Sequence, residues 1–113
     1  MDMEVKQLRN TVVVKLDGEM DMLMAEKLKK DIDQRLLNKP IANLIIDMEK
    51  VTFIDSSGLG AIIGIYKKIN AVGGGIAMLG TQPHVRKVLV FSGIDKLVNI
   101  YSNECDDIMD EFR

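Results

Sequence analysis

The sequence predicts a small α/β fold, a single domain over residues 1–113 that is built on a mixed β-sheet. From residue 11 onward, short apolar and β-branched runs alternate with segments of helical periodicity. The helical segments are long enough to cross over between parallel strands. The first two apolar runs are joined by a connection too short for such a crossover, so we expect them to pair antiparallel.

Two strands are expected at the start of the chain. Apolar and polar residues alternate over residues 3–7, which predicts a short first strand, and Asn10 marks a turn. Residues 11–16 are rich in valine and predict a second strand. We expect Gly18 to end it.

A helix and a third strand follow. Residues 23–38 carry an apolar side chain at every fourth position, which predicts an amphipathic helix that Pro40 stops. These apolar residues are Met24, Leu28, Ile32 and Leu36. The apolar run of residues 44–46 lies between Asn43 and Asp47 and predicts a short, buried strand of a partly parallel sheet.

The rest of the chain continues the alternation. A helix is expected after residue 57, ended by the glycines at residues 73–75, and its inward residues are expected to be Leu59, Ile62, Ile63, Tyr66 and Ile69. Residues 76–79 predict a strand, and Pro83 is typical of the first position of a helix. Residues 97–100 predict the last strand, and residues 103–112 predict a final helix with Ile108 and Phe112 inward.

The most informative segment is an apolar run that ends in Asp55, Ser56 and Ser57 just before a helix. Aspartate or serine at this position accepts hydrogen bonds from the free N–H groups of the first turn. A phosphate on Ser57 would meet such N–H groups and the positive end of the helix dipole. The segment therefore suggests a phosphorylation switch, although a simple helix cap is the commoner role of these residue types.

Composition narrows the class of protein. The chain has 113 residues, of which 47% are hydrophobic, and no tryptophan, so one core of Ile, Leu, Val and Met is expected. A net charge of −2 does not favour nucleic acid or an anionic membrane as a partner. Cys105 is the only cysteine, which rules out an internal disulfide. No signal pattern or long apolar run is present, so we expect a cytoplasmic protein.

Motifs for catalysis or metal binding are poorly matched. No P-loop sequence occurs, and around Ser57 the glycines of a nucleophile elbow are replaced by Asp55 and Leu59. The only histidine, His84, lies near an expected helix start, where a surface or capping role is the commoner one. One cysteine and one histidine cannot form a zinc tetrad. We therefore expect no enzyme activity, no metal and no cofactor.

A phospho-aspartate receiver domain is the alternative from another class. Asp47 would be the acceptor at the end of an apolar strand. Receivers also need an acidic pair that holds Mg²⁺, whereas Asp17, Glu19 and Asp21 are expected to be spread through one loop after the second strand. We interpret Asp47 as a polar residue at the end of a strand.

Three segments resemble a known family. Residues 55–60, Asp-Ser-Ser-Gly-Leu-Gly, resemble the signature of bacterial anti-sigma-factor antagonists, which are STAS domains. Residues 18–21, Gly-Glu-Met-Asp, are similar to a second element of that family, and residues 91–94 resemble a third. The resemblance extends over nearly the whole chain and is greatest to members that act in sporulation. It implies a small sheet with helices mainly on one side.

The resemblance also implies a function. The unmodified protein would bind an anti-sigma factor that is also a serine kinase, and so release the sigma factor. The kinase would phosphorylate Ser57, the second serine of the motif, and switch binding off; a separate serine phosphatase would reverse this. ATP and Mg²⁺ would belong to the kinase. The alternative within the family is a stress-response or scaffold STAS protein with another kinase.

The expected partner-binding residues come from the first two of these segments. They are Glu19, Asp21, Asp55, Ser56, Ser57, Gly58, Leu59 and Gly60. We expect Gly58 and Gly60 to let a partner approach closely, while the alternative for Gly60 is that it packs the helix on the sheet together with Gly64. Met20 and Met22 fit either the core or the interface.

Overall fold

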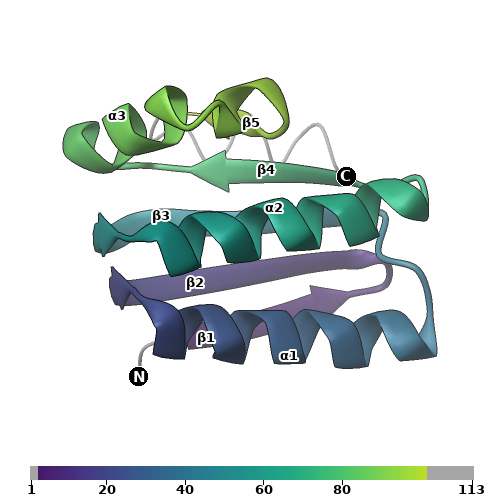
Figure 1. The fold of residues 1–113 in the computed structure, drawn as a ribbon. Helices are drawn as coiled ribbons and strands as arrows, with labels where there is room; N and C mark the ends of the chain where they lie inside the picture. Colours follow the sequence, from purple (N-terminus) through teal and green to yellow (C-terminus); the bar gives the residue numbers. More distant parts are fainter. Residues whose placement is uncertain (1–2, 102–113) are drawn as a thin grey trace.

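The computed structural model of the protein describes residues 3–101, which form one five-stranded sheet and three α-helices (Figure 1). In chain order the elements are β1 (Met3–Leu8), β2 (Thr11–Met20), α1 (Met22–Asn38), β3 (Asn43–Ile54), α2 (Ser56–Ala71), β4 (Gly75–Leu79), α3 (Pro83–Phe91), the 3-10 turn η1 (Ile94–Lys96) and β5 (Asn99–Tyr101). The strands lie in the order β1-β2-β3-β4-β5. β1 is antiparallel to β2 and the other pairs are parallel, which confirms the predicted mixed sheet.

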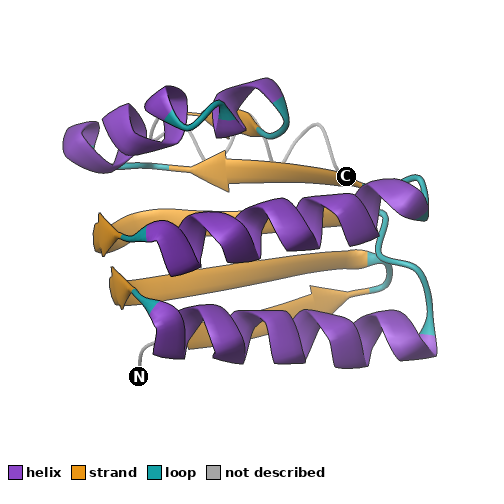
Figure 2. Ribbon diagram, in the orientation of Figure 1, coloured by secondary structure: helices purple, strands orange, loops and turns teal. Residues whose placement is uncertain are grey.

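All three helices lie on the same face of the sheet (Figures 1 and 2). Each crossover joins neighbouring parallel strands and advances in the same direction across the sheet, so a constant right-handed sense places every helix on one side. This arrangement confirms the helix placement that the family resemblance implies.

The core fills the space between the sheet and the helices. Val12, Val14 and Leu16 of β2 alternate toward the helices and are buried, as a strand with one covered face requires. On α1 the buried residues are Met24, Ala25, Leu28 and Ile32, which confirms the helical period. On α2 the centre of the buried stripe includes Ile65, which the sequence prediction missed.

Two strands are longer than predicted. Gly18 does not end β2, because the strand continues to Met20 through an irregular register around this glycine. Gly18 has φ +106°, a conformation that favours glycine, and so lets the strand bend and continue. β3 likewise runs on to Ile54, pairing with the extended β2, so Asp47 lies inside a strand and its interpretation as a strand-end residue is wrong.

The last part of the described chain agrees with the sequence in outline. α3 begins at Pro83, as predicted. The last strand begins at Asn99 rather than at residue 97, because Leu97 and Val98 belong to the turn that follows η1, where both of their N–H groups donate to the Ile94 carbonyl. The predicted final helix over residues 103–112 lies outside the described residues.

Candidate functional site

The site predicted from the motif lies where β2 and β3 end side by side and each passes into a helix (Figure 1). Asp21 caps α1, since its Oδ1 accepts the N–H of Met24 at 3.1 Å. Asp55 caps α2 in the same way, accepting the N–H of Gly58 at 3.0 Å. The Asp55 N–H also donates to the Met20 carbonyl, 3.4 Å away, so the two helix starts are held together.

The two serines occupy the first turn of α2. Ser56 is the first helical residue and is exposed, and Ser57 follows it and is half-buried. The capping role expected of this motif falls to Asp55, which leaves both hydroxyls at the edge of the molecule. The N-terminus of a 16-residue helix points its positive dipole end toward this edge.

Gly58 is internal, so the expectation of close approach by a partner is corrected for this residue. It is buried, and a Cβ atom there would lie 2.5 Å from the Met20 carbonyl oxygen and 2.8 Å from Cγ1 of Ile54. Gly58 therefore lets the start of α2 approach the ends of β2 and β3.

Gly60 has the opposite surroundings. It is exposed, and an added Cβ would meet nothing within 4 Å, which fits the expected surface position. The same is true of the space around Gly64, so the alternative that these two glycines pack the helix tightly on the sheet is wrong.

The acidic residues are distributed differently from the prediction. Asp17 and Glu19 are exposed residues of β2, and only Asp21 lies between elements, so they do not share one loop. Glu19 pairs in register with Phe53, one strand away. Glu19, Asp21 and the start of α2 thus belong to the same edge of the molecule.

Apolar side chains are exposed at this edge, and two of them, Leu23 and Phe53, were not predicted. Met22, Leu23 and Phe53 are between 48% and 64% exposed. By contrast Met20 is fully buried, so of the two methionines left open by the sequence, Met20 belongs to the core and Met22 to the surface. The sequence contains a signal for the exposure of Met22 and Leu23. Both residues precede Met24, which is the first apolar residue on the buried face of α1.

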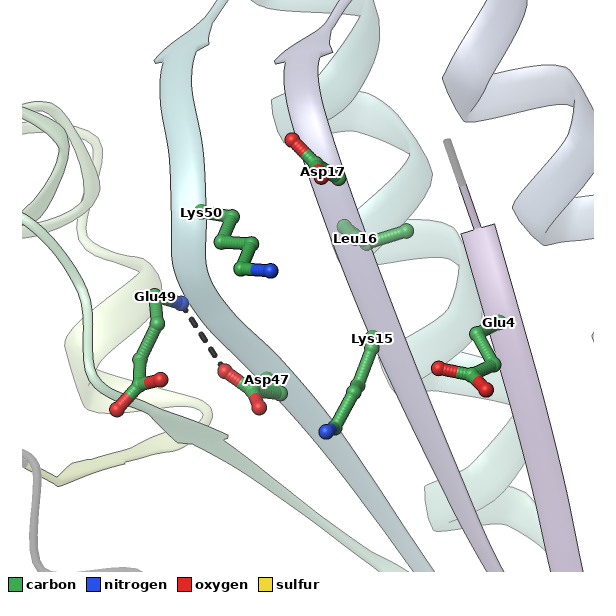
Figure 3. Close-up of a pocket in the computed structure, with 7 residues that line it drawn as sticks. All are labelled: Glu4, Lys15, Leu16, Asp17, Asp47, Glu49 and Lys50. Atoms are coloured by element: carbon green, nitrogen blue, oxygen red, sulfur yellow. Dashed lines mark hydrogen bonds between the residues drawn. The ribbon is translucent and has the colours of Figure 1, made fainter. Parts of the chain in front are cut away.

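Asp47 points away from the helices into a shallow groove (Figure 3). Its Oδ1 accepts the backbone N–H of Glu49 at 3.0 Å. The groove is lined by charges of both signs from Glu4, Lys15, Asp17, Asp47, Glu49 and Lys50, with Leu16. Asp47 is seven residues from the end of β3, so the premise of the receiver alternative, an acceptor at a strand end, is wrong.

Among residues 3–101 no group of three or more His, Cys, Asp or Glu is arranged to hold a metal ion.

His84 is engaged with the backbone. Its Nε2 hydrogen-bonds with the carbonyl of Thr52, and Gln82 Nε2 donates to the carbonyl of Glu49 at 3.0 Å. β4 pairs with β3 only as far as Asp47, so these side chains hold α3 against the part of β3 that pairs with β2 but not with β4. Over the described residues, no helix is long and apolar enough to cross a membrane.

Comparisons with known proteins point to one family. The sequence profile of the STAS domain matches residues 2–106. The anti-sigma F factor antagonist of Paenibacillus polymyxa is 33% identical over 104 residues, which are 92% of this chain and 89% of that protein. The anti-sigma factor antagonist SpoIIAA in its unphosphorylated form has a similar structure, with a TM-score of 0.88 at 29% identity over 98% of this chain and 96% of that one. The phosphorylated form of the Bacillus cell fate determinant SpoIIAA matches with a TM-score of 0.81 at 28% identity, over 98% of this chain and 99% of that one.

Proposed function

This chain belongs to the STAS domain family, and from that premise we propose that it is an anti-sigma-factor antagonist. In its unphosphorylated form it binds an anti-sigma factor serine kinase in the cytoplasm and so releases the sigma factor. Phosphorylation of Ser57 switches this binding off. The chain acts as a regulatory protein without catalysis of its own, and its role is in sporulation transcription.

The observation that carries the proposal is the placement of Ser57. It lies in the first turn of α2, at an edge shared with Glu19 and Asp21, while Asp55 already satisfies the capping requirement. A kinase can reach a hydroxyl at this position without unfolding a strand or a helix. SpoIIAA, whose structure is similar, is known in phosphorylated and unphosphorylated forms, which supports a phosphorylation switch on this fold.

The effect of the phosphate follows from its charge and its surroundings. A phosphoserine carries about −1.5 to −2 charges at neutral pH. The helix start supplies N–H donors and a favourable dipole, so the phosphate is tolerated by the fold. The same group adds bulk and negative charge two residues from Asp55, on the edge that also carries Glu19 and Asp21, and so opposes a partner that approaches this acidic edge. Blocked contact, rather than refolding, switches binding off.

The edge also indicates the chemistry of the partner surface. Glu19 and Asp21 favour a basic patch on the kinase and accelerate association at low salt. The exposed Met22, Leu23 and Phe53 fit an apolar centre inside that patch. ATP and Mg²⁺ are bound by the kinase, and a separate serine phosphatase restores the active form.

The test is a phosphorylation assay with anti-sigma kinases from the same genome. The chain, Ser57→Ala and the matched control Ser56→Ala are incubated with each kinase and ATP, and the modified residue is mapped by mass spectrometry. We expect labelling of the chain and of Ser56→Ala, and none of Ser57→Ala. Full labelling of Ser57→Ala on Ser56 contradicts the assignment of the acceptor, and labelling by a kinase unrelated to sporulation supports the stress-response or scaffold alternative.

A further inference from the structure

β1 is an edge strand whose outer side is open. Within residues 3–101 it pairs only with β2, and no described strand lies beyond it (Figure 1). Met3 and Val5 pack against the core on the helix side of the sheet but are only half-buried, whereas Val12 and Val14 of β2 are fully buried. α1 therefore covers β2 and leaves space beside β1.

The backbone of β1 directs hydrogen-bonding groups to this open side. The β1–β2 hairpin has a two-residue turn, and such a turn is closed by a hydrogen-bonded pair, here Leu8 with Thr11. Hydrogen-bonded and non-hydrogen-bonded pairs alternate along an antiparallel ladder. The N–H and C=O groups of Met3, Val5 and Gln7 therefore point away from β2. An edge with such groups is a template for a further strand.

The charges of β1 are complementary to those of an antiparallel copy of β1. Glu4 and Lys6 lie on either side of Val5 and are exposed. Figure 3 shows Glu4 on the face opposite the helices, and the alternation of the strand places Lys6 on the same face. A copy centred on Val5 would place Glu4 of each chain opposite Lys6 of the other.

We propose that the outer side of β1 binds β1 of a second copy, so that the chain forms a symmetric dimer with one continuous sheet. In this dimer Val5 pairs with Val5 of the second copy through their outward N–H and C=O groups. Glu4 and Lys6 of the two chains form the adjacent non-hydrogen-bonded pairs, in which side chains approach most closely. Opposite charges at such positions stabilise a strand pair.

The charge pattern also determines the register of the two strands. A two-fold axis at Glu4 or Lys6 would place like charges directly opposite each other, which destabilises a strand pair. An axis at Met3 or Gln7 lies near an end of β1 and pairs only part of the strand. An axis at Val5 aligns residues 3–7 of both chains and brings opposite charges together.

The dimer leaves the carboxyl edge of each sheet open. Its axis is perpendicular to the sheet, so the helices of both copies lie on one face. β2 and its counterpart run in opposite directions, which places the two edges that carry Ser57 at opposite ends of the continuous sheet. The dimer is therefore bivalent for any partner of this edge, and its formation is independent of the proposed function.

The test is sedimentation of the full chain. β1 supplies six residues, compared with about 20–30 on each side of a standard interface, so we expect a weak dimer that forms between about 10 μM and 1 mM. The single variants Glu4→Lys and Lys6→Glu should remain monomeric, because each has only like charges at the paired positions. An equal mixture of the two should dimerise again, because the acidic side chains of one then lie opposite the lysines of the other. Monomers of the unmodified chain at all concentrations, or monomers in the mixture, would overturn the proposal.

Asp95→Lys is the matched control for net charge. It makes the same charge change as Glu4→Lys at an exposed residue of η1, on the β5 side of the sheet (Figure 1). It should dimerise like the unmodified chain. Monomers of this variant would mean that net charge, and not the pairing of β1, determines association. All samples are measured at a temperature where melting curves show them to be folded.

Hydrogen exchange distinguishes this interface from any other contact between two copies. In the unmodified chain, the amides of Val5 and Gln7 should exchange several-fold more slowly at the upper concentration than at the lower one, because they gain a partner. In Glu4→Lys their exchange should not depend on concentration. A dimer in which these two amides exchange equally fast at both concentrations contradicts pairing through β1.

Discussion

Gly58 and Gly60 lie two residues apart on one helix and are predicted to respond oppositely to alanine. In Gly58→Ala the new Cβ would clash with the carbonyl oxygen of Met20. Because this oxygen belongs to the backbone of β2, relieving the clash must shift the strand or the helix, and we expect a loss of about 1–3 kcal/mol in the free energy of unfolding. Gly60→Ala meets nothing within 4 Å and should gain up to about 1 kcal/mol through helix propensity. Urea unfolding of both variants measures this difference, and equal stabilities contradict it.

Gly60→Ala is also predicted to weaken kinase binding, because its side chain adds bulk at an exposed position one helical turn from Ser57, the proposed acceptor. The affinity is measured by titration at a temperature where all variants are folded. Unchanged affinity per folded molecule would remove Gly60 from the interface.

Asp21 caps α1 and has a proposed role in binding, and substitution can separate the two. Asp21→Lys removes the cap of α1 as well as a negative charge, so we expect a loss of about 1 kcal/mol of stability in addition to weaker binding. Asp21→Asn keeps a good capping side chain and loses only the charge. It should preserve the melting temperature but slow association with the kinase at low salt. Stopped-flow rates at two salt concentrations test this, and an unchanged rate would exclude Asp21 from the interface.

The two ends of α1 each carry an exposed leucine, and only one of them lies at the proposed interface. Leu23 lies in its first turn beside the site, and Leu37 lies at its other end; both are exposed. Leu23→Ser is predicted to lower kinase affinity at least several-fold, because an apolar interface contact is lost. Leu37→Ser should leave affinity unchanged. Both affinities are measured by calorimetry, and equal affinities would contradict an apolar centre at this edge.

The periodicity of the sequence predicts which elements exist better than where they end. The four-residue spacing from Met24 to Ile32 specifies α1, since burial requires one apolar face. The ends of β2 and β3 were missed because their distal parts carry charged residues such as Asp17 and Lys50 on the face without helices. When the pairing of the two strands is not known, such charged residues indicate a turn rather than the continuation of a strand.

The sequence predicts only part of the candidate site, because the other part depends on contacts between strands. Asp55 and the two serines are contiguous, so the local pattern identifies the helix start. The exposure of Phe53 and the burial of Met20 depend on the register between β2 and β3, which no local pattern contains. The internal role of Gly58 likewise depends on a neighbour from another strand.

For the whole molecule, stability and binding are predicted to be separable at residue 57. Ser57→Asp places a negative charge in the first turn of α2, which helix electrostatics favour by about 0.3–1 kcal/mol. We therefore expect an unchanged or slightly higher melting temperature and an unchanged circular dichroism spectrum, together with loss of kinase binding. Thermal melts and titrations on one preparation test both. A large drop in melting temperature would mean that the switch acts by unfolding.

The strand order β1-β2-β3-β4-β5 is also the order of the strands along the chain, and this affects how the protein emerges from the ribosome. The β1–β2 hairpin has both of its strands as soon as residue 20 is free, and each later strand adds to the edge left by the one before it. Among residues 3–101, no strand waits for a partner that has yet to be synthesised. At about 5–20 residues per second, translation is slow compared with hairpin and helix formation. The sheet is therefore able to grow from one edge to the other during synthesis.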